Sequence, residues 1–253
     1  MNNPLFSCVI PVKGKRPYFE SALASLYNQG CDNLEIIVQN GDIEPDAGQS
    51  DALNKGFAKA SGEWLFWLNA DDVLLPGALK KVWGRINKFD RIEWLAGNTI
   101  YIDKEDKVIG TRRDARWLPW FGNRMSVWTG GPSAFFRKEL WQAHGGFDTK
   151  LKFVMDLDLW TRWARVGIRF EYVDDYIWGF RVHEESATNK TCNRREIAQE
   201  FQDVLRRHDI RHEKLWRNIT RFSSILDGSR WHKMKDSLRF RGKALFDCVG
   251  GMA

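Results

Sequence analysis

The sequence lacks paired cysteines at metal-ligand spacing, long apolar runs and a recognisable secretion signal. Its four cysteines are scattered, and two of them lie in apolar stretches, as buried thiols in a reducing compartment do. No apolar run reaches the roughly 18 residues that a membrane span needs, and the chain does not open with a basic segment followed by an apolar one. We therefore expect a cytoplasmic protein that is neither secreted through a signal peptide nor transmembrane.

The net charge is concentrated at one end of the chain. Hydrophobic residues make up 43% of the 253 residues and charged residues 28%, which is typical of globular proteins and argues against disorder. Residues 191–253 contain 14 Lys and Arg against 8 Asp and Glu, so they account for the whole net charge of +6. The composition thus indicates a neutral body followed by a basic tail.

The first part of the chain alternates between apolar strands and amphipathic helices. The predicted strands are 5–12, 34–40 and 63–70, and the predicted helices are 17–30, 50–62 and 76–89. Apolar strands separated by helices indicate a mostly parallel sheet with helices on both faces. Ligands of such sheets bind at the carboxyl ends of the strands, so functional residues are expected there.

Two adjacent carboxylates, Asp71 and Asp72, follow the third predicted strand, and Asn69 lies just before them. These side chains supply oxygen ligands for a hard divalent cation such as Mg²⁺ or Mn²⁺, which in turn binds phosphates. The alternative is helix capping, because an Asp shortly before a Pro-initiated helix often caps it. A cap accounts for one Asp, whereas a metal site accounts for both.

Residues 45–79, PDAGQSDALNKGFAKASGEWLFWLNADDVLLPGAL, resemble the nucleotide-sugar half of family 2 glycosyltransferases, the inverting enzymes with the GT-A fold. Residues 130–167 and the segment FRVHEESA at 180–187 are similar to the acceptor half of that family. The resemblance extends over about residues 5–190. It implies an α/β fold with a Rossmann-like, mostly parallel sheet. It also implies transfer of a sugar from a nucleoside diphosphate sugar to an acceptor hydroxyl, with inversion at the anomeric carbon.

This resemblance sets the expected domain organisation. A GT-A domain is expected over 1–190, with the nucleotide-sugar half at 1–103 and the acceptor half at 104–190. Residues 191–253 are expected to form a basic, amphipathic helical extension. Within the acceptor half, residues 104–128 are rich in Trp and Arg. They are compatible with an acceptor mouth and equally with a small core under a long loop.

A one-step sugar transfer needs a base for the acceptor hydroxyl and positive charge beside the leaving diphosphate. The resemblance assigns the base to Asp156 in FVMDLDLW, although the acid that often precedes it in relatives is Met155 here. In a helix that begins near Asp156, Trp160 and Trp163 share its face, which suits a sugar-binding wall. The alternative is a capping Asp on a helix whose Trp face is core.

Asp158 is a second, supporting catalytic candidate. The alternative for Asp158 is a surface ion pair with Arg162, which lies four residues further along the helix. For the acceptor, we assign contacts to Trp160 and Arg137.

The resemblance also assigns the remaining site residues. The expected donor-binding residues are Pro11, Val12, Asn40, Asp42, Gln49, Asp51, Asn54, Lys55, Asn69 and Asp71. The expected metal ligands are Asp71, Asp72 and His183 in FRVHEESA, although a lone His is more often structural. Asp51, Asn54 and Lys55 open the second predicted helix, where backbone N–H groups can receive phosphate. The alternative there is a capped, solvated first turn.

One departure from the family concerns the nucleobase. Relatives carry an acidic residue after the second strand that recognises the base, and Asn40 stands at that position here. Only eight residues separate Asn40 from Gln49, so the predicted base pocket is shortened. Asn40 and Asp42 are candidates for a base contact, and uracil, guanine and thymine donors are all compatible.

The tail carries two apolar stripes at helical spacing. They consist of Ile197, Phe201, Val204 and Leu205, and of Leu215, Trp216, Ile219, Phe222 and Leu226. We expect these stripes to pack mainly onto the domain. The alternative is peripheral attachment to an anionic membrane, on its inner face, which would suit a lipid-linked acceptor. No nucleic-acid partner is expected, because the tail shows no recognised fold for it.

Three functions are therefore compared. The main expectation is a glycosyltransferase that acts on a carbohydrate or lipid-linked acceptor in polysaccharide or glycolipid assembly. A nucleotidyltransferase would share the sheet and the acidic pair, but it would release pyrophosphate and would lack the base in MDLDLW. A non-catalytic carbohydrate- or membrane-binding adaptor is the third, motivated by the shortened base pocket.

Overall fold

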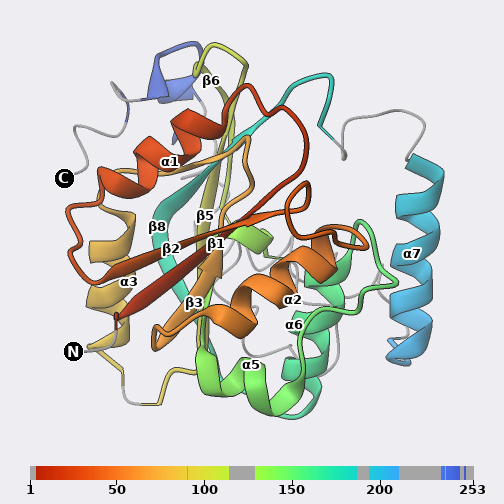
Figure 1. Ribbon diagram of the computed structural model, residues 1–253. Helices are drawn as coiled ribbons and strands as arrows, with labels where there is room; N and C mark the ends of the chain where they lie inside the picture. Colours follow the sequence, from red (N-terminus) through yellow and green to blue (C-terminus); the bar gives the residue numbers. More distant parts are fainter. Residues whose placement is uncertain are drawn as a thin grey trace.

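A mixed eight-stranded sheet runs through the protein, with helices on both of its faces (Figure 1). The computed structural model describes residues 4–89, 91–113, 129–186 and 194–210, together with 235–236, 238–245 and 248. The strands are β1 (Phe6–Val12), β2 (Leu34–Asn40), β3 (Trp64–Trp67), β4 (Val73–Leu74), β5 (Trp94–Ile102), β6 (Val108–Arg112), β7 (Ala134–Arg137) and β8 (Phe170–Arg181). The helices are α1 (Phe19–Tyr27), α2 (Gln49–Lys59), α3 (Ala78–Ile86), α5 (Lys138–His144), α6 (Met155–Arg165) and α7 (Arg194–Arg207), with a short 3₁₀ helix η1 (Gly131–Ser133).

The strand order is β2-β1-β3-β7-β5-β8-β4. The remaining strand, β6, pairs with β5 outside this order. The strands β2, β1 and β3 are parallel, as predicted for the first half of the chain. β7 is antiparallel to both β3 and β5, and β8 is parallel to β5. β5 and β8 therefore run in the same direction as β1 to β3, and the carboxyl ends of these five strands meet at one edge of the sheet. The mixed pairing around β7 was not visible in the sequence.

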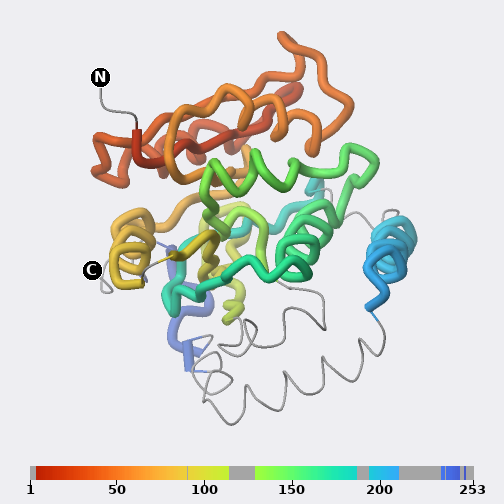
Figure 2. The backbone as a smooth tube through the Cα atoms, turned by 90° about the horizontal axis from the view of Figure 1, so that it is seen from below, coloured from red at the N-terminus to blue at the C-terminus, as the bar shows by residue number. Residues whose placement is uncertain are grey.

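Two apolar layers fill the space between the sheet and its helices. α1 and α3 cover one face, where Leu26 and Val82 pack against strand residues. α2, α5 and α6 cover the other face, where Phe57 and Leu140 lie in the second cluster. The helix α7 lies beside α6 at the outside of this second layer (Figures 1 and 2), and its Val204 belongs to the same cluster.

Four tryptophans fix α6 to the sheet. Trp160 stacks on Trp94 with ring centroids 4.8 Å apart and an interplanar angle of 14°, and it also stacks on Trp67 at 6.1 Å. Trp163 meets Trp94 edge-on at 5.7 Å. All four indoles are fully buried. Since aromatic side chains contribute large buried areas and specific ring geometry, this cluster fixes where the first turn of α6 lies.

The described parts of the tail pack on the domain. On α7, Val204 and Leu205 are buried, and Phe201 packs against the same cluster as the tryptophans. Further along, Phe240 and Leu245 are buried among residues of β5, β6 and β8. The second predicted stripe, and residues 114–128 of the Trp- and Arg-rich segment, lie outside the described residues. In the part of the chain that the structure describes, no helix is long and apolar enough to cross a membrane.

The buried indole stack predicts a large stability loss on truncation. Trp160→Ala removes a fully buried ring between β3, β5 and α6, so the free energy of unfolding should fall by about 3–5 kcal/mol. Trp83→Ala on α3 is the matched control, because that indole is 38% exposed, and its loss should be clearly smaller. Urea denaturation of both variants measures the difference. Equal losses would show that the stack does not hold α6.

Candidate active site

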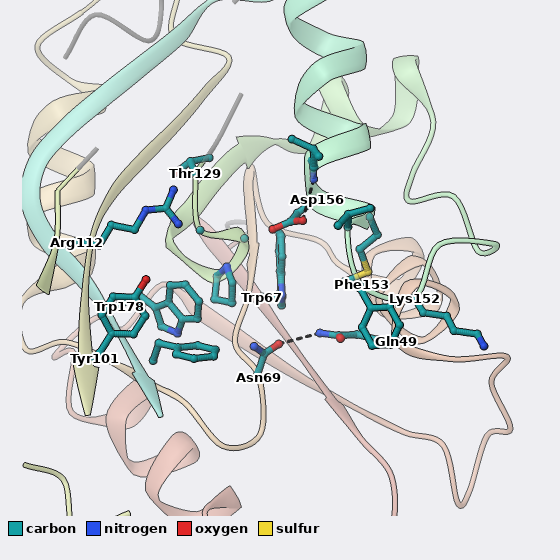
Figure 3. Close-up of a pocket in the computed structure, with 17 residues that line it drawn as sticks. Gln49, Trp67, Asn69, Tyr101, Arg112, Thr129, Lys152, Phe153, Asp156 and Trp178 are labelled. Atoms are coloured by element: carbon teal, nitrogen blue, oxygen red, sulfur yellow. Dashed lines mark hydrogen bonds between the residues drawn. The ribbon is translucent and has the colours of Figure 1, made fainter. Parts of the chain in front are cut away.

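A cavity of about 380 Å³ opens at the carboxyl edge of the sheet (Figure 3). It lies between β3, β5, β6 and β8, the η1 turn and the first turn of α6. Its charged and polar lining residues are Gln49, Asn69, Arg112, Thr129, Lys152 and Asp156, and its aromatic lining residues are Trp67, Tyr101, Phe153, Trp178 and Phe180. The cavity therefore offers aromatic walls and a small number of polar groups, which is the usual composition of a small-molecule site.

Asp156 lies at the first turn of α6 with its carboxylate facing this cavity (Figure 3). Its Oδ1 accepts a hydrogen bond from the backbone N–H of Leu157 at 2.8 Å. Burial raises the pKa of Asp156 to about 6, although the Leu157 N–H and the positive charge of Arg112 act in the opposite direction. A carboxylate with a pKa near neutrality is a stronger proton acceptor than an ordinary Asp, and it is still ionised at pH 7.

Gly131 leaves space for the Asp156 carboxylate. A Cβ atom on Gly131 would lie 3.1 Å from Asp156 Oδ2 and 2.3 Å from a ring carbon of Trp67. The η1 turn can therefore pass closely over the indole and beside the acid only because residue 131 has no side chain.

Arg112, at the end of β6, was not selected from the sequence. Its guanidinium points into the cavity on the same side as Asp156 (Figure 3), and its charge lowers the pKa of that acid against the effect of burial. Residue spacing carries no signal for this arrangement. It arises because β6 pairs with β5 at a register that places Arg112 opposite Thr99.

A second polar cluster follows β3 at the same edge of the sheet. Asp71 Oδ2 lies 2.9 Å from Nε2 of His183, which follows β8. Asp72 is buried, with Oδ1 accepting the backbone N–H of Arg181 at 2.9 Å and Oδ2 accepting the amide of Asn69 at 2.8 Å. Burial, and then the negative charge of Asp71, raise the pKa of Asp72 well above its usual range. The structure thus places Asp71, Asp72 and His183 close together, but the two carboxylates have different surroundings.

The prediction that Asp72 is a metal ligand does not fit its geometry, because both of its oxygens already accept hydrogen bonds away from solvent. Asp71 and His183 do fit, since a carboxylate oxygen and an imidazole nitrogen are donors that divalent metals take in proteins. Within the described ranges, no group of three or more His, Cys, Asp or Glu is placed to hold a metal. Two protein ligands would leave the other positions of a metal to phosphate and water oxygens.

Arg181 lies in the segment FRVHEESA but was not selected from the sequence, and it proves to hold the acidic pair in place. Its side chain is buried, and its Nε donates to the carbonyl oxygen of Asp71 at 2.8 Å. Its Nη1 lies 2.7 Å from Asp106 Oδ1, and its guanidinium stacks over the ring of Tyr18 at 4.4 Å. Arg181 therefore ties the turn after β3 to the β5–β6 hairpin and to the segment before α1.

The residues predicted to contact the nucleotide lie at the expected edge of the sheet. Pro11 and Val12 are the last residues of β1, and Asn40 is the last residue of β2. Asp42 bridges the two strand ends, because its Oδ2 accepts the backbone N–H of Gly14 at 2.7 Å and its own N–H donates to Asn40 Oδ1 at 2.9 Å. These groups do not line the cavity itself.

At the start of α2, the predicted residues divide into two groups. Gln49 lines the cavity and donates its amide to Asn69 Oδ1 at 2.9 Å (Figure 3). Asp51 and Lys55 instead pair with each other at 2.9 Å and bond the backbone of the preceding loop. Asn54 exchanges two 2.9 Å hydrogen bonds with the backbone of Phe147. Asp51, Asn54 and Lys55 therefore act in this structure as loop anchors, which differs both from the predicted donor contacts and from the capped, solvated first turn of the alternative, because α2 has no side-chain cap.

The two predicted acceptor contacts need correction. Trp160 is fully buried in the indole cluster, so it offers no surface to a sugar. Asp156 and Trp160 share one helix face, but Asp156 lines the cavity, whereas Trp160, one turn later, packs in the core. Arg137 of β7 is the register partner of Trp64 at the beginning of β3. It therefore lies at the edge of the sheet opposite the acidic pair. Its guanidinium binds Glu63 at 2.6 Å.

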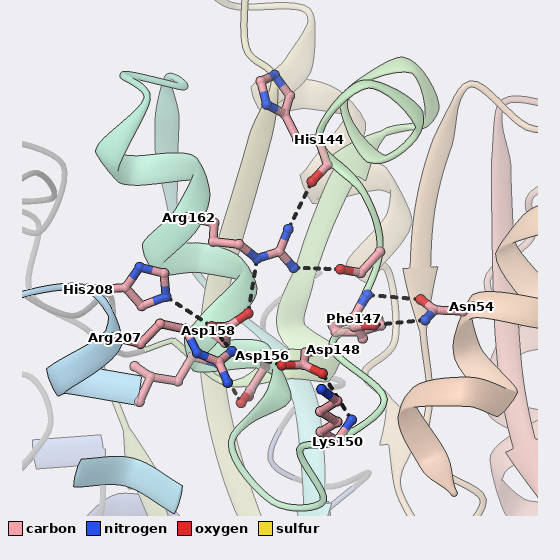
Figure 4. Close-up of polar contacts among 12 residues, drawn as sticks. Asn54, His144, Phe147, Asp148, Lys150, Asp156, Asp158, Arg162, Arg207 and His208 are labelled. Carbon is pink, nitrogen blue, oxygen red and sulfur yellow. Dashed lines mark hydrogen bonds and ion pairs between the residues drawn. The ribbon is translucent and has the colours of Figure 1, made fainter. Parts of the chain in front are cut away.

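Asp158 also lies away from the cavity. Because successive helix residues turn by about 100°, Asp158 points to the side of α6 roughly opposite Asp156. Its carboxylate pairs with Arg162 at 3.0 Å, as the alternative predicted, but it is buried and not at the surface, and it also pairs with Arg207 and His208 beyond α6 (Figure 4). This placement does not support a role as a second base.

Comparisons with known proteins agree with this geometry. Residues 43–142 match the family described as Glycosyl transferase family 2. An uncharacterized glycosyltransferase of Rickettsia prowazekii is 27% identical over 233 residues, covering 80% of this chain and 70% of the relative.

Two solved structures have the same architecture. TarS of S. aureus, residues 1–349 in complex with UDP-GlcNAc, aligns with a TM-score of 0.58 at 16% identity, covering 74% of this chain and 61% of that one. The mannosyltransferase PcManGT from Pyrobaculum calidifontis, in complex with GDP-Man and Mn²⁺, aligns with a TM-score of 0.58 at 19% identity, covering 81% and 65%. This chain thus spans less than two thirds of either solved protein. The likeness shows that the fold is GT-A. Over residues 43–142 the chain is similar to the glycosyltransferases of family 2.

The raised pKa of Asp156 predicts a pH-dependent stability difference. Folding raises the pKa from about 3.9 to about 6, so the folded state binds the proton more tightly than the unfolded chain. Wild-type stability therefore falls as the pH rises from about 4 to about 6, whereas Asp156→Asn lacks this loss. At pH 7.5 the variant should be more stable by about 2–3 kcal/mol. Urea denaturation at pH 7.5 and near pH 4.5 tests this, since the gain should shrink at the lower pH. An equal difference at both values would contradict it.

Proposed function

We propose that this protein transfers a sugar from a nucleoside diphosphate sugar to an acceptor hydroxyl, with inversion at the anomeric carbon. The observation that carries the proposal is that one cavity holds Asp156, with its pKa of about 6, and extends to Asn69 beside the Asp71 and Asp72 pair. A base and a phosphate-binding corner at two ends of one space match the two requirements of a one-step displacement.

Different residues act at the two ends of the cavity. As the acceptor oxygen attacks the anomeric carbon, Asp156 takes the hydroxyl proton, and the bond from that carbon to the diphosphate oxygen breaks. The aromatic walls, which include Tyr101 and Trp178, exclude water and suit the faces of sugar rings. Arg112 keeps enough positive charge near Asp156 to hold it ionised at neutral pH.

A divalent metal, Mg²⁺ or Mn²⁺, is part of this proposal. Asp71 and His183 would hold it, and it would neutralise charge on the diphosphate as the sugar departs. Asp72, through its hydrogen bonds to Asn69 and to the backbone of Arg181, keeps the turn that carries Asp71 in place. The complexes of PcManGT with GDP-Man and Mn²⁺ and of TarS with UDP-GlcNAc support a nucleotide-sugar donor and a metal.

The acceptor is proposed to be a carbohydrate or a lipid-linked sugar, in polysaccharide or glycolipid assembly. The family match favours this function over a nucleotidyltransferase, which would make the nucleotide-sugar bond and release pyrophosphate.

The function predicts metal-dependent release of nucleoside diphosphate that requires Asp156. Purified protein should be screened with UDP-, GDP- and dTDP-sugars in Mn²⁺, Mg²⁺ and EDTA, with nucleoside diphosphate as the readout. Asp156→Asn should lower turnover by about 10² or more while nucleotide binding stays nearly intact, because only the proton acceptor is lost. For wild type, kcat/KM should fall as the pH drops below about 6.

The control is Asp32→Asn, which changes an exposed acid before β2 and should leave turnover unchanged. Near wild-type turnover of Asp156→Asn would place the base elsewhere. Release of pyrophosphate would indicate a nucleotidyltransferase, and no release from any donor would favour an adaptor.

A further inference from the structure

Helix α7, in the basic tail, makes polar contacts on both sides of Asp156. On one side, the carboxylate of Glu200 accepts the backbone N–H of Lys152 at 3.0 Å and that of Phe153 at 2.9 Å. Lys152 and Phe153 both line the cavity. Glu200 therefore fixes the backbone that leads into α6, three residues before Asp156.

On the other side, α7 holds Asp158. Oδ1 of Asp158 lies 3.1 Å from Nη1 of Arg207, the last residue of α7, and 2.9 Å from Nε2 of His208 (Figure 4). The same Arg207 nitrogen binds Asp148 Oδ2 at 2.8 Å. The Asp158 side chain is only 2% exposed, whereas that of Arg207 is 44% exposed. Loss of Arg207 would leave a buried carboxylate with fewer compensating contacts, which is destabilising.

One face of α7 makes all of these contacts. Glu200, Val204, Arg207 and His208 follow the i, i+4, i+7, i+8 spacing of a helix face, and Val204 is fully buried between the polar groups. The helix is thus held to the domain by an apolar centre with a polar contact at each end.

The first turn of α6 needs such support from outside. The residue at its N-terminal cap is Val154, whose side chain makes no capping hydrogen bond. The N–H groups before and within the first turn of a helix need partners from elsewhere, and a carboxylate near that end is favoured by the helix dipole. Asp156 accepts one of these N–H groups, that of Leu157, and Glu200 adds a carboxylate for the N–H groups of Lys152 and Phe153 just before the helix.

We infer that α7 is a positioning element of the active site, which holds the 152–158 segment so that the Asp156 carboxylate stays at the acceptor end of the cavity, out of bulk water. The inference rests on the proposed role of Asp156 as base. Residues 191–210 would then belong functionally to the catalytic domain. Without the two contacts, the segment can move and admit water, so Asp156 becomes a weaker base in a less defined place.

The test compares Glu200→Ala and Arg207→Ala with the matched control Arg206→Ala. Arg206 is the neighbour of Arg207 on α7, and its guanidinium pairs only with exposed Asp203 among the contacts described. In the two test variants kcat should fall about 10-fold or more, because small displacements of a reacting group are costly, while the Kd for nucleoside diphosphate should stay within about twofold. Arg206→Ala should resemble wild type in both.

A second readout separates positioning from simple loss of structure. The acid limb of the pH–rate profile should move from about 6 toward the ordinary Asp value of about 4, because water reaches Asp156. Glu200→Gln should recover part of kcat, since its amide oxygen still accepts one of the two N–H groups. An unmoved limb, with activity lost only in proportion to the folded fraction, would overturn the inference.

Amide hydrogen exchange keeps the test independent of the proposed function. Exchange over residues 152–158 should speed up in Glu200→Ala and in Arg207→Ala but not in Arg206→Ala. Unchanged exchange in the test variants would show that α7 does not hold the segment. If exchange speeds up but Asp156→Asn retains full turnover, Asp156 is not the base. In that case α7 holds the segment, but its contacts have no role in catalysis.

Discussion

The partial burial of one carboxylate is the constraint on which the rest of this site depends. Asp156 begins a helix, accepts a backbone N–H and faces Arg112, and each of these contacts stabilises the ionised acid. Burial outweighs them, and the pKa comes to about 6. A more exposed acid would be a weaker base, and an acid buried without Arg112 would be less ionised at neutral pH. The balance leaves a carboxylate that is ionised at neutral pH and accepts a proton more readily than an ordinary Asp, as the proposed base requires.

Several parts of the fold hold Asp156 in place. The indole stack of Trp67, Trp94 and Trp160 fixes α6 against β3 and β5. Gly131 lets the η1 turn close over the acid. The two carboxylates after β3 differ in their contacts. Asp72 accepts hydrogen bonds from Asn69 and from the backbone of Arg181 inside the protein, whereas Asp71 lies beside His183. One carboxylate of the pair thus supports the turn, and the other is partly exposed and pairs with His183.

Local patterns predicted the parts of the fold that depend on local physics. The first three strands and helices were recognised because burial on two faces and helical spacing leave periodic apolar residues, as in LEIIVQN and its neighbours. β3 ends at Trp67, before the predicted residue 70, because the chain turns there to present Asn69 and the acidic pair. The antiparallel insertion of β7 and the register of β6 depend on long-range pairing, which no short motif encodes.

The same distinction explains the site. Family resemblance brought Asp71, Asp72 and His183 to one corner, and it placed Asp156 at a helix start beside the cavity. It could not say that Trp160 would meet the core one turn later, or that Arg137 would lie at the opposite edge of the sheet. Arg112 and Arg181 were missed because their roles come from strand register and from packing between distant segments.

The central claim is that the acceptor attacks from the side of Asp156 while the diphosphate leaves toward Asp71 and His183. The stereochemistry of the product tests this most directly. With an α-linked nucleotide-sugar as donor, NMR of the isolated product should show the anomeric proton coupling of a β-glycoside, because a single displacement inverts the anomeric carbon. An α-linked product would require retention, and it would contradict a mechanism with Asp156 as the base of one direct displacement.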